Sequence, residues 1–373
     1  MIIGSQDQQK QLSHYFLKGE ALKRFFDIIA TSVGLVNSFF IIRALSVYQF
    51  GLYQLILSFI AIASNFNIVE MLNEVVGVDI RRLISTSQLS MAKRLFWESA
   101  LLKVGLGLLL AAAIFLGSSI ISDSYSQDIG IFIKISSLLL IIRALESSAT
   151  AFFKSVISFV YWSFPAIREV VKFLLIILAI NFYYFDLPEL VVIYVITEAV
   201  AVFVLVSFSF LWRYRKVFGS VTMTREWIFP GLIKNYGGWL VIRYSVSRIT
   251  KGVMPWLVKV FINTEAVAFY ALAVNLIAFI EGTLPLNGLT PILSLKMEKR
   301  SELAYIFKQA MKYAFWLGLV LAVVSVIAVP LVVVLIFPNY APAMPIFRLM
   351  VLALPFYGVF KVLKSTLTVL REQ

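Results

Sequence analysis

The chain has 373 residues, of which 61% are hydrophobic and 14% are charged. Soluble domains carry roughly 45–50% apolar and about 25% charged residues, so this composition excludes an ordinary soluble enzyme and favours a membrane protein. The formal net charge is +13, but the cations lie mostly between apolar runs, which argues against a nucleic-acid-binding surface. The chain has no cysteine and one histidine, His14, so we expect no metal site, no cofactor and no histidine-based catalysis.

The predicted elements begin with a cytoplasmic segment, residues 1–24, in which residues 13–24 form an amphipathic helix on the membrane surface. We expect no cleavable signal peptide before the first apolar run, which begins near Phe25. A membrane span needs about 20 mainly apolar residues. Ten such runs follow in order: 25–45, 50–72, 98–118, 129–151, 169–185, 190–212, 239–260, 266–287, 313–337 and 344–364. The sequence therefore predicts an all-α, polytopic transmembrane bundle of about ten spans.

The loops between these runs alternate in charge. Every second loop, such as 81–94, 213–234 and 296–308, is rich in lysine and arginine, whereas the loops between are short and poor in cations. Cytoplasmic loops carry the excess of positive charge in membrane proteins. We therefore expect a multi-pass protein of the cytoplasmic (inner) membrane with both termini in the cytoplasm.

An internal repeat relates the two halves of the chain. Tyr53, Leu55 and Ile60 of the second predicted span match residues of the eighth, namely Tyr270, Leu272 and Ile277. A second echo, at nearly the same offset, matches Tyr125, Ile131 and Phe132 with Tyr340, Ile346 and Phe347. Repeats in one orientation give two lobes about an axis along the membrane normal.

This repeat predicts two pseudo-symmetric lobes. The N-terminal lobe, residues 25–212, has six spans, and the cytoplasmic linker 213–238 leads to a C-terminal lobe, 239–373, with four. The second lobe is incomplete in this register, because the counterparts of spans five and six would follow Gln373.

Five passages of the sequence form a recognisable set: Arg43-Ala44-Leu45, Phe50-Gly51-Leu52-Tyr53, Glu265 to Ala273, Leu289-Thr290-Pro291-Ile292-Leu293-Ser294 and Phe337 to Ala343. Together they resemble the Wzx-type polysaccharide flippases of the multidrug/oligosaccharidyl-lipid/polysaccharide (MOP) exporter superfamily. The likeness covers the chain from about residue 20 onward. It implies a flippase that transfers undecaprenyl-diphosphate-linked oligosaccharide to the outer leaflet, for lipopolysaccharide or other surface polysaccharide synthesis. The implied partners are this lipid-linked substrate, membrane lipids, a polysaccharide polymerase and glycosyltransferases.

Ionisable residues inside spans are the candidates for function, because each costs roughly 2.5–3.5 kcal/mol at mid-span unless it is paired or faces water. Arg243, Arg248 and Lys251 share one side of span seven and are predicted to bind an anionic substrate. The other interpretation is that these cations have a structural role and extend toward the cytoplasmic interface.

The remaining candidates lie in three other spans. Arg143 and Glu146 are three residues apart in span four, so they either neutralise each other or contribute to the site. Glu198 in span six and Glu281 in span eight either pair across helices or take part in ion coupling.

Three alternatives to a flippase stay open at this point. A cation or drug exporter of the same superfamily calls for acidic cavity residues. A membrane-embedded enzyme calls for a long external loop or a catalytic motif, and neither is present in the sequence, so we predict that the chain is not an enzyme. A truncated, non-transporting membrane scaffold is the third.

Overall fold

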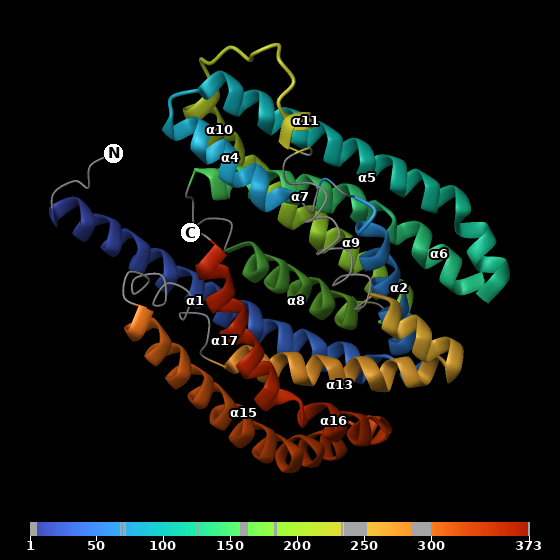
Figure 1. Ribbon diagram of the computed structural model, residues 1–373. Coiled ribbons are helices and arrows are strands. Elements are labelled where there is room, and N and C mark those ends of the chain that lie inside the picture. The colour runs from blue at the N-terminus through green and yellow to red at the C-terminus, as the bar shows by residue number, and fades with distance from the viewer. Residues whose placement is uncertain are drawn as a thin grey trace. The chain divides into compact units, whose positions relative to one another are not determined.

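The computed structural model describes residues 6–67, 69, 72–125, 127–156, 163–182, 185–232, 234, 252–284 and 300–371. The regular secondary structure in these ranges is helical, as the composition predicts (Figure 1). The helices group into two compact units, Met1–Trp256 and Leu257–Gln373. A short apolar helix, Gly252–Phe261, crosses the boundary between them. The all-α polytopic fold is therefore confirmed, while the predicted lobe boundaries stay a prediction.

Unit 1 contains most of the helices. They are α1 (Gln6–Ala44), α2 (Val47–Ser64), α4 (Asn73–Ser85), α5 (Leu89–Tyr125), α6 (Gln127–Ser136), α7 (Leu138–Ser155), α8 (Phe164–Phe182), α9 (Leu187–Val204), the π-helical turn η2 (Leu205–Phe210), α10 (Leu211–Phe218) and α11 (Phe229–Leu232). α1 packs along α8, and α5 packs against α6 and α7. Because α1 is one continuous helix, residues 13–24 continue directly into the first span; their position on the membrane surface stays a prediction.

Short loops stop and restart the helices with side-chain caps. The Ser46 side chain accepts from the Gln49 backbone N–H, and the Gln49 side chain accepts from the Ser46 N–H, which makes a capping box at the start of α2. Asp186 and Glu189 form the corresponding box at the start of α9. These caps satisfy N–H groups that have no partner within the helix.

Aromatic rings form the core at one end of unit 1. Phe96 of α5, Phe152 of α7 and Phe210 of η2 lie 5.1–5.8 Å apart between ring centroids. Tyr214 of α10 joins them and accepts a hydrogen bond from Trp97 Nε1 at 2.6 Å. These ring contacts pack α5 and α7 against η2 and α10.

Unit 2 repeats part of this design. Its helices are α13 (Thr264–Thr283), α15 (Arg300–Ile336), the 3₁₀ turn η4 (Pro338–Tyr340), α16 (Ala343–Val351) and α17 (Leu354–Arg371). α17 packs against α15, and α16 packs against α13. The α16–α17 pair bends by 48° at a short break. Pro355 lies just after that break, where its missing N–H removes a hydrogen bond that would continue the helix.

Six described helices are long and apolar enough to cross a membrane, or seven with the α16–α17 pair counted as one span. α7 and α8 have 18 and 19 residues, but each carries three charged residues. They correspond to predicted spans four and five. Predicted span seven lies mostly outside the described residues. α7 and α8, which do not meet the apolar criterion, carry Arg143, Glu146, Arg168, Glu169 and Lys172, which are considered next.

Candidate functional site

The predicted site residues are divided among three parts of the chain. Arg143 and Glu146 lie on α7 and Glu198 lies on α9, all in unit 1, whereas Glu281 lies on α13 in unit 2. Arg243, Arg248 and Lys251 lie outside the described residues. The described part of the candidate site is therefore a network in unit 1.

Arg168 of α8 is the centre of this network. Its Nη2 lies 2.9 Å from Oε1 of Glu146, and its Nε lies 3.0 Å from Oε2 of Glu198. The Glu198 side chain is only 1% exposed, so this ion pair is largely shielded from water. One guanidinium group thus joins α7, α8 and α9 by two ion pairs.

The expected pairing of Arg143 with Glu146 is replaced by a different arrangement. Arg143 donates hydrogen bonds to the hydroxyls of Ser64 on α2, at 3.4 Å, and Tyr194 on α9, at 3.3 Å. Glu146 forms its ion pair with Arg168 instead, because α8 brings that guanidinium between the two carboxylates. In the described structure, therefore, Arg143 is a partly exposed cation whose hydrogen bonds go to neutral groups.

A second group extends the network to α1. The buried Asn37 side chain donates to the backbone oxygen and to Oε2 of Glu169 on α8, at 2.9 and 2.8 Å. Lys172 Nζ lies 2.7 Å from Oε1 of the same carboxylate and 5.8 Å from the ring centroid of Tyr194. We call the whole set the polar network: Asn37, Ser64, Arg143, Glu146, Arg168, Glu169, Lys172, Tyr194 and Glu198.

The sequence reasoning missed Arg168, Glu169 and Lys172 as site residues. It placed Arg168 in a cytoplasmic loop because the predicted fifth span began at residue 169, whereas α8 begins at Phe164. The signal that was present is the spacing of these three charges within one helical turn of a long apolar segment. Three cations and three carboxylates balance within the polar network, which limits the cost of burying them.

A buried lysine on α5 was also missed. Lys103 is 0% exposed, and its Nζ donates to Oδ1 of Asn73 on α4. The Asn73 amide in turn donates to the Ser147 carbonyl of α7 at 3.0 Å. This contact ties the short helix α4 to both of its long neighbours.

Glu281 has partners in its own unit. Its carboxylate lies near the side chains of Tyr357 and Lys361, both on α17. Both interpretations of Glu281 from sequence, pairing across helices and ion coupling, stay predictions. Within the described ranges, no group of three or more histidine, cysteine, aspartate or glutamate side chains is arranged to hold a metal.

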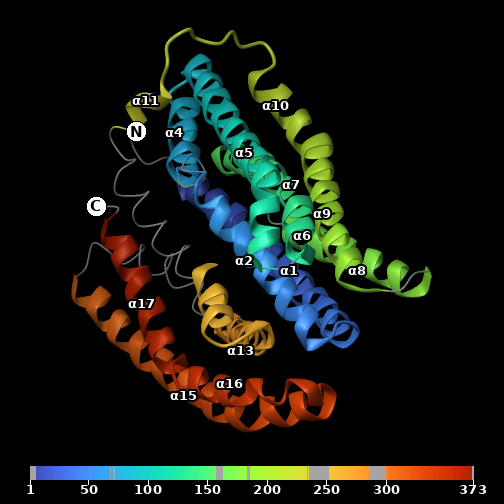
Figure 2. The ribbon, with the colours of Figure 1, turned by 90° about the vertical axis from the view of Figure 1, so that its right-hand side faces the viewer.

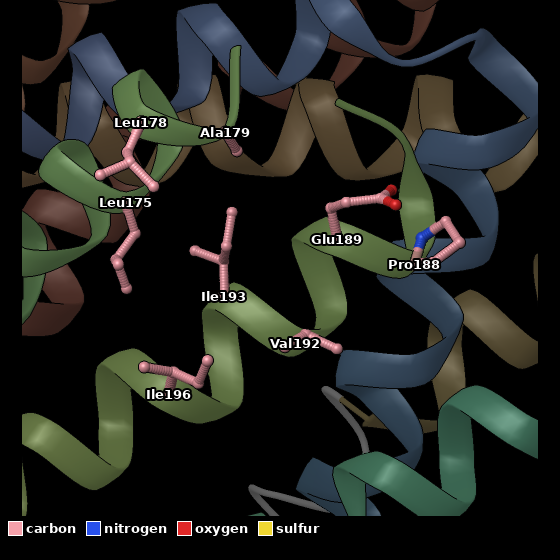
Figure 3. A pocket seen from close by; sticks show the side chains of 8 residues that line it. All are labelled: Leu175, Leu178, Ala179, Pro188, Glu189, Val192, Ile193 and Ile196. Carbon is pink, nitrogen blue, oxygen red and sulfur yellow. The ribbon is translucent and has the colours of Figure 1, made fainter. Parts of the chain in front are cut away.

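A cavity of about 330 Å³ lies between α8 and α9, away from these charges (Figure 3). Leu175, Leu178 and Ile193 form part of its apolar wall, and Glu189 and Pro188 lie at one end. Its lining suits hydrocarbon rather than a sugar or a diphosphate. The cavity therefore does not mark the polar site.

Known structures resemble this arrangement. One is an inward-facing multidrug resistance MATE family transporter of the MOP superfamily; the TM-score is 0.68 and the identity 12%, over 91% of this chain and 83% of that one. A MATE structure in a bent conformation gives a TM-score of 0.55 at 15% identity, over 91% and 82% of the chains. A point mutant of a MATE protein gives 0.55 at 14% identity, over 96% and 83%.

The chain has the fold of MATE transporters. Identities of 12–15% show this shared fold and leave the substrate open. No protein-family model matches the sequence, and no curated protein matches it significantly. The likeness thus shows the fold, and the superfamily and flippase subgroup suggested by the sequence stay proposals.

Proposed function

We propose that this protein is a membrane transporter that works by alternating access and moves undecaprenyl-diphosphate-linked oligosaccharide across the cytoplasmic membrane. The observation that carries the transport part is the polar network inside a MATE-like fold. Charged side chains within membrane helices are expensive and usually mark a substrate or ion pathway. Here the network includes Glu198 and Asn37, which are each only 1% exposed.

The polar network suits a protein that changes conformation. Arg168 holds α7, α8 and α9 together through two carboxylates, so protonation or cation binding at Glu198 would weaken one of its two ion pairs. A two-state element that an ion can bias is the physical requirement for coupled transport. Glu146, Glu198 and, in unit 2, Glu281 are the proposed ion-coupling residues.

An anionic substrate requires cations whose hydrogen-bond donors are not held by a carboxylate. Arg143 is one candidate, because its described hydrogen bonds go to hydroxyls. Arg243, Arg248 and Lys251, which share one helical face in the predicted seventh span, are the others. A guanidinium binds a diphosphate with two parallel hydrogen bonds, and an ammonium adds a point charge.

A cation or drug exporter is the second candidate. One structural neighbour is a multidrug resistance transporter by its description, and the buried carboxylates Glu146 and Glu198 would suit a cationic cargo or a coupling ion. The two candidates require opposite charges in the substrate cavity. They can therefore be separated by the same set of variants.

The test is transport by the purified chain in lipid vesicles, with a fluorescent undecaprenyl-diphosphate oligosaccharide in one assay and a cationic dye in the other. Arg143, Arg248 and Lys251 are each changed to alanine, and Arg248 also to lysine. The flippase proposal expects that the alanine variants lose lipid-linked oligosaccharide transport at normal membrane abundance and that Arg248→Lys retains part of it. Arg348→Ala, at an exposed cation on α16, serves as the matched control.

Full oligosaccharide transport by all three alanine variants would contradict the cationic site. Dye transport by the parent chain that is lost in Glu198→Gln, without oligosaccharide transport, would establish the exporter instead. Neither activity in the parent chain would favour the scaffold.

A further inference from the structure

The predicted linker between the lobes, residues 213–238, contains a segment that is attached to α5 at both ends. We call residues 218–229 the strap. At its first end, Lys93 Nζ donates to the backbone oxygens of Phe218, at 3.1 Å, and Val221, at 2.7 Å. A lysine that reaches the last carbonyls of a helix satisfies acceptors that have no partner inside the helix. Lys93 therefore caps the end of α10.

At the second end, Glu98 accepts two backbone hydrogen bonds. Its Oε2 lies 3.0 Å from the Ile228 nitrogen and 2.8 Å from the Phe229 nitrogen. Its Oε1 pairs with Arg94, whose guanidinium also lies 5.1 Å from the centroid of the Trp227 ring. The Glu98 side chain is 4% exposed, so these charge-assisted bonds are screened little by water.

Apolar packing supports both attachments. Phe218 and Phe229 are 0% and 1% exposed and belong to one core cluster with Leu95 and Phe96 of α5. Between them, Thr222, Met223 and Trp227 are exposed. Both views show the strap crossing over the end of α5 (Figure 1 and Figure 2). The strap is thus a bridge whose two ends are buried and whose middle is in solvent.

Lys93 and Glu98 are five positions apart, which is about 7.5 Å along a helix axis. Both attachments are therefore made by the same one and a half turns of α5, and they cannot move relative to each other without breaking that helix. A crossover that acted as a flexible joint would instead have few buried contacts and solvent-exposed backbone groups.

We propose that Lys93 and Glu98 are positioning residues that fix the strap to α5, so that the strap moves as part of unit 1 and is not the joint between the two units. The movement rests on the proposed alternating-access function, whereas the attachment does not. The sequence alone predicts residues 213–238 to be one inter-lobe linker; in this proposal its first half belongs mechanically to unit 1.

Distances between pairs of spin labels test this proposal. The chain has no cysteine, so cysteines introduced in pairs can be labelled without background. The exposed positions Gln88, Arg225 and Lys308 report on the start of α5, the strap and unit 2. Pulsed electron paramagnetic resonance is recorded on the full chain in lipid vesicles, in neutral and acidic buffer, with and without an undecaprenyl-diphosphate oligosaccharide.

We expect a narrow Gln88–Arg225 distance that is the same in every condition. The Arg225–Lys308 and Gln88–Lys308 distances are expected to change together between conditions. Two variants, Lys93→Met and Glu98→Ala, are made separately in case one of them fails to fold. Each is expected to broaden the distribution of Gln88–Arg225 distances. Glu98→Gln keeps one acceptor oxygen and should restore part of the narrow peak, and Glu226→Ala, at an exposed carboxylate of the strap, should leave it unchanged.

A Gln88–Arg225 distance that stays narrow in both Lys93→Met and Glu98→Ala would overturn the proposed attachment. A parent distance that varies with condition as Arg225–Lys308 does would overturn it too. If both distances to Lys308 stay constant in every condition, alternating access is contradicted, while the response to the variants still decides the attachment.

Discussion

Unit 1 and unit 2 contain helices of matching lengths, but different types of residue lie at the contacts between those helices. α5 and α15 each have 37 residues, and α7 and α17 each have 18. The nineteenth residue of both long helices is a glycine. A Cβ on Gly107 would lie 3.1 Å from the Leu140 carbonyl oxygen of α7, and one on Gly318 would lie 2.8 Å from Cα of Pro355 in α17. Each unit therefore brings its long helix against the start of its partner through the same small residue.

The difference appears about one turn further along the same helix pair. In the register of the sequence repeat, Arg143 of unit 1 corresponds to Gly358 of unit 2. A Cβ on Gly358 would lie 2.8 Å from the Ala314 carbonyl oxygen, so α15 and α17 approach closely there. At the position along α5 that matches Ala314, unit 1 has the buried Lys103.

The same pair of helices is thus packed through small residues in one unit and contains charged side chains in the other. Small residues in unit 2 close the helix interface with van der Waals contact, as they commonly do between membrane helices. Unit 1 keeps room at the same level for charged side chains and neutralises them with carboxylates from α7, α8 and α9. The ion pairs of Arg168 with Glu146 and Glu198 lie in unit 1, and the predictions below test this difference between the units.

The largest effect is expected at Arg168. Arg168→Met leaves two carboxylates without their cation, which should destabilise the protein by about 3–5 kcal/mol. Lys361→Met in unit 2 should cost less, because Lys361 is only partly buried. Thermal unfolding midpoints of both variants in detergent measure the difference, and adding Glu198→Gln should recover part of the loss in the Arg168 variant. Equal midpoints for the two single variants would remove the asymmetry between the units.

The second effect concerns the shared glycine. Gly318→Ala forces a methyl group within 3 Å of backbone and should destabilise the protein by about 1–3 kcal/mol. Gly107→Ala should cost less, because its nearest contacts are longer, at 3.1 and 3.2 Å. Gly105→Ala is the control, since nothing lies within 4 Å of its Cβ position. The order of the three unfolding midpoints is the measurement, and a Gly105 variant as unstable as Gly318→Ala would argue against the packing explanation.

A third effect appears only in alkaline solution. Burial raises the pKa of Tyr340, in the turn before α16, to about 12, whereas an unfolded tyrosine titrates near about 10. Stability is therefore complete below about pH 10 and falls as the unfolded state ionises first, by about 1.4 kcal/mol at about pH 11. Tyr340→Phe should lack this component. The difference in stability between parent and variant should stay constant up to about pH 9 and then shift in favour of the variant; a constant difference up to about pH 11 would contradict the assignment.

The last prediction concerns the orientation of the two units in the membrane and not stability. A repeat in one orientation, together with the charge of the loops, predicts that the segments 81–94 and 296–308 both lie on the cytoplasmic side. Cysteines introduced at Ser87 and Lys308 should both resist an impermeant thiol reagent added to intact cells and react after the membrane is opened. Labelling of only one of them from outside would indicate an inverted repeat.

Sequence alone was sufficient for the membrane class, the helical fold and the positions of most spans. These follow from local properties: about 20 apolar residues must be helical in lipid because each backbone N–H needs a partner within its own segment. The repeat stays a prediction; Leu55 of α2 and Leu272 of α13, which it aligns, are both buried. The role of Gly107 and Gly318 in close helix packing is visible only in the tertiary structure.

The charge partners were decided by tertiary structure. Spacing along α7 suggested that Arg143 and Glu146 pair, but Arg168 comes from α8 and reaches Glu146 and Glu198 because packing places α8 beside α7 and α9. In the same way, nothing in the sequence indicated that Glu98 would bind the backbone of residues 228 and 229, about 130 positions away. A helix period relates residues within one turn of each other, whereas the energy of a buried charge depends on every group that surrounds it, and those groups come from helices far apart in the chain.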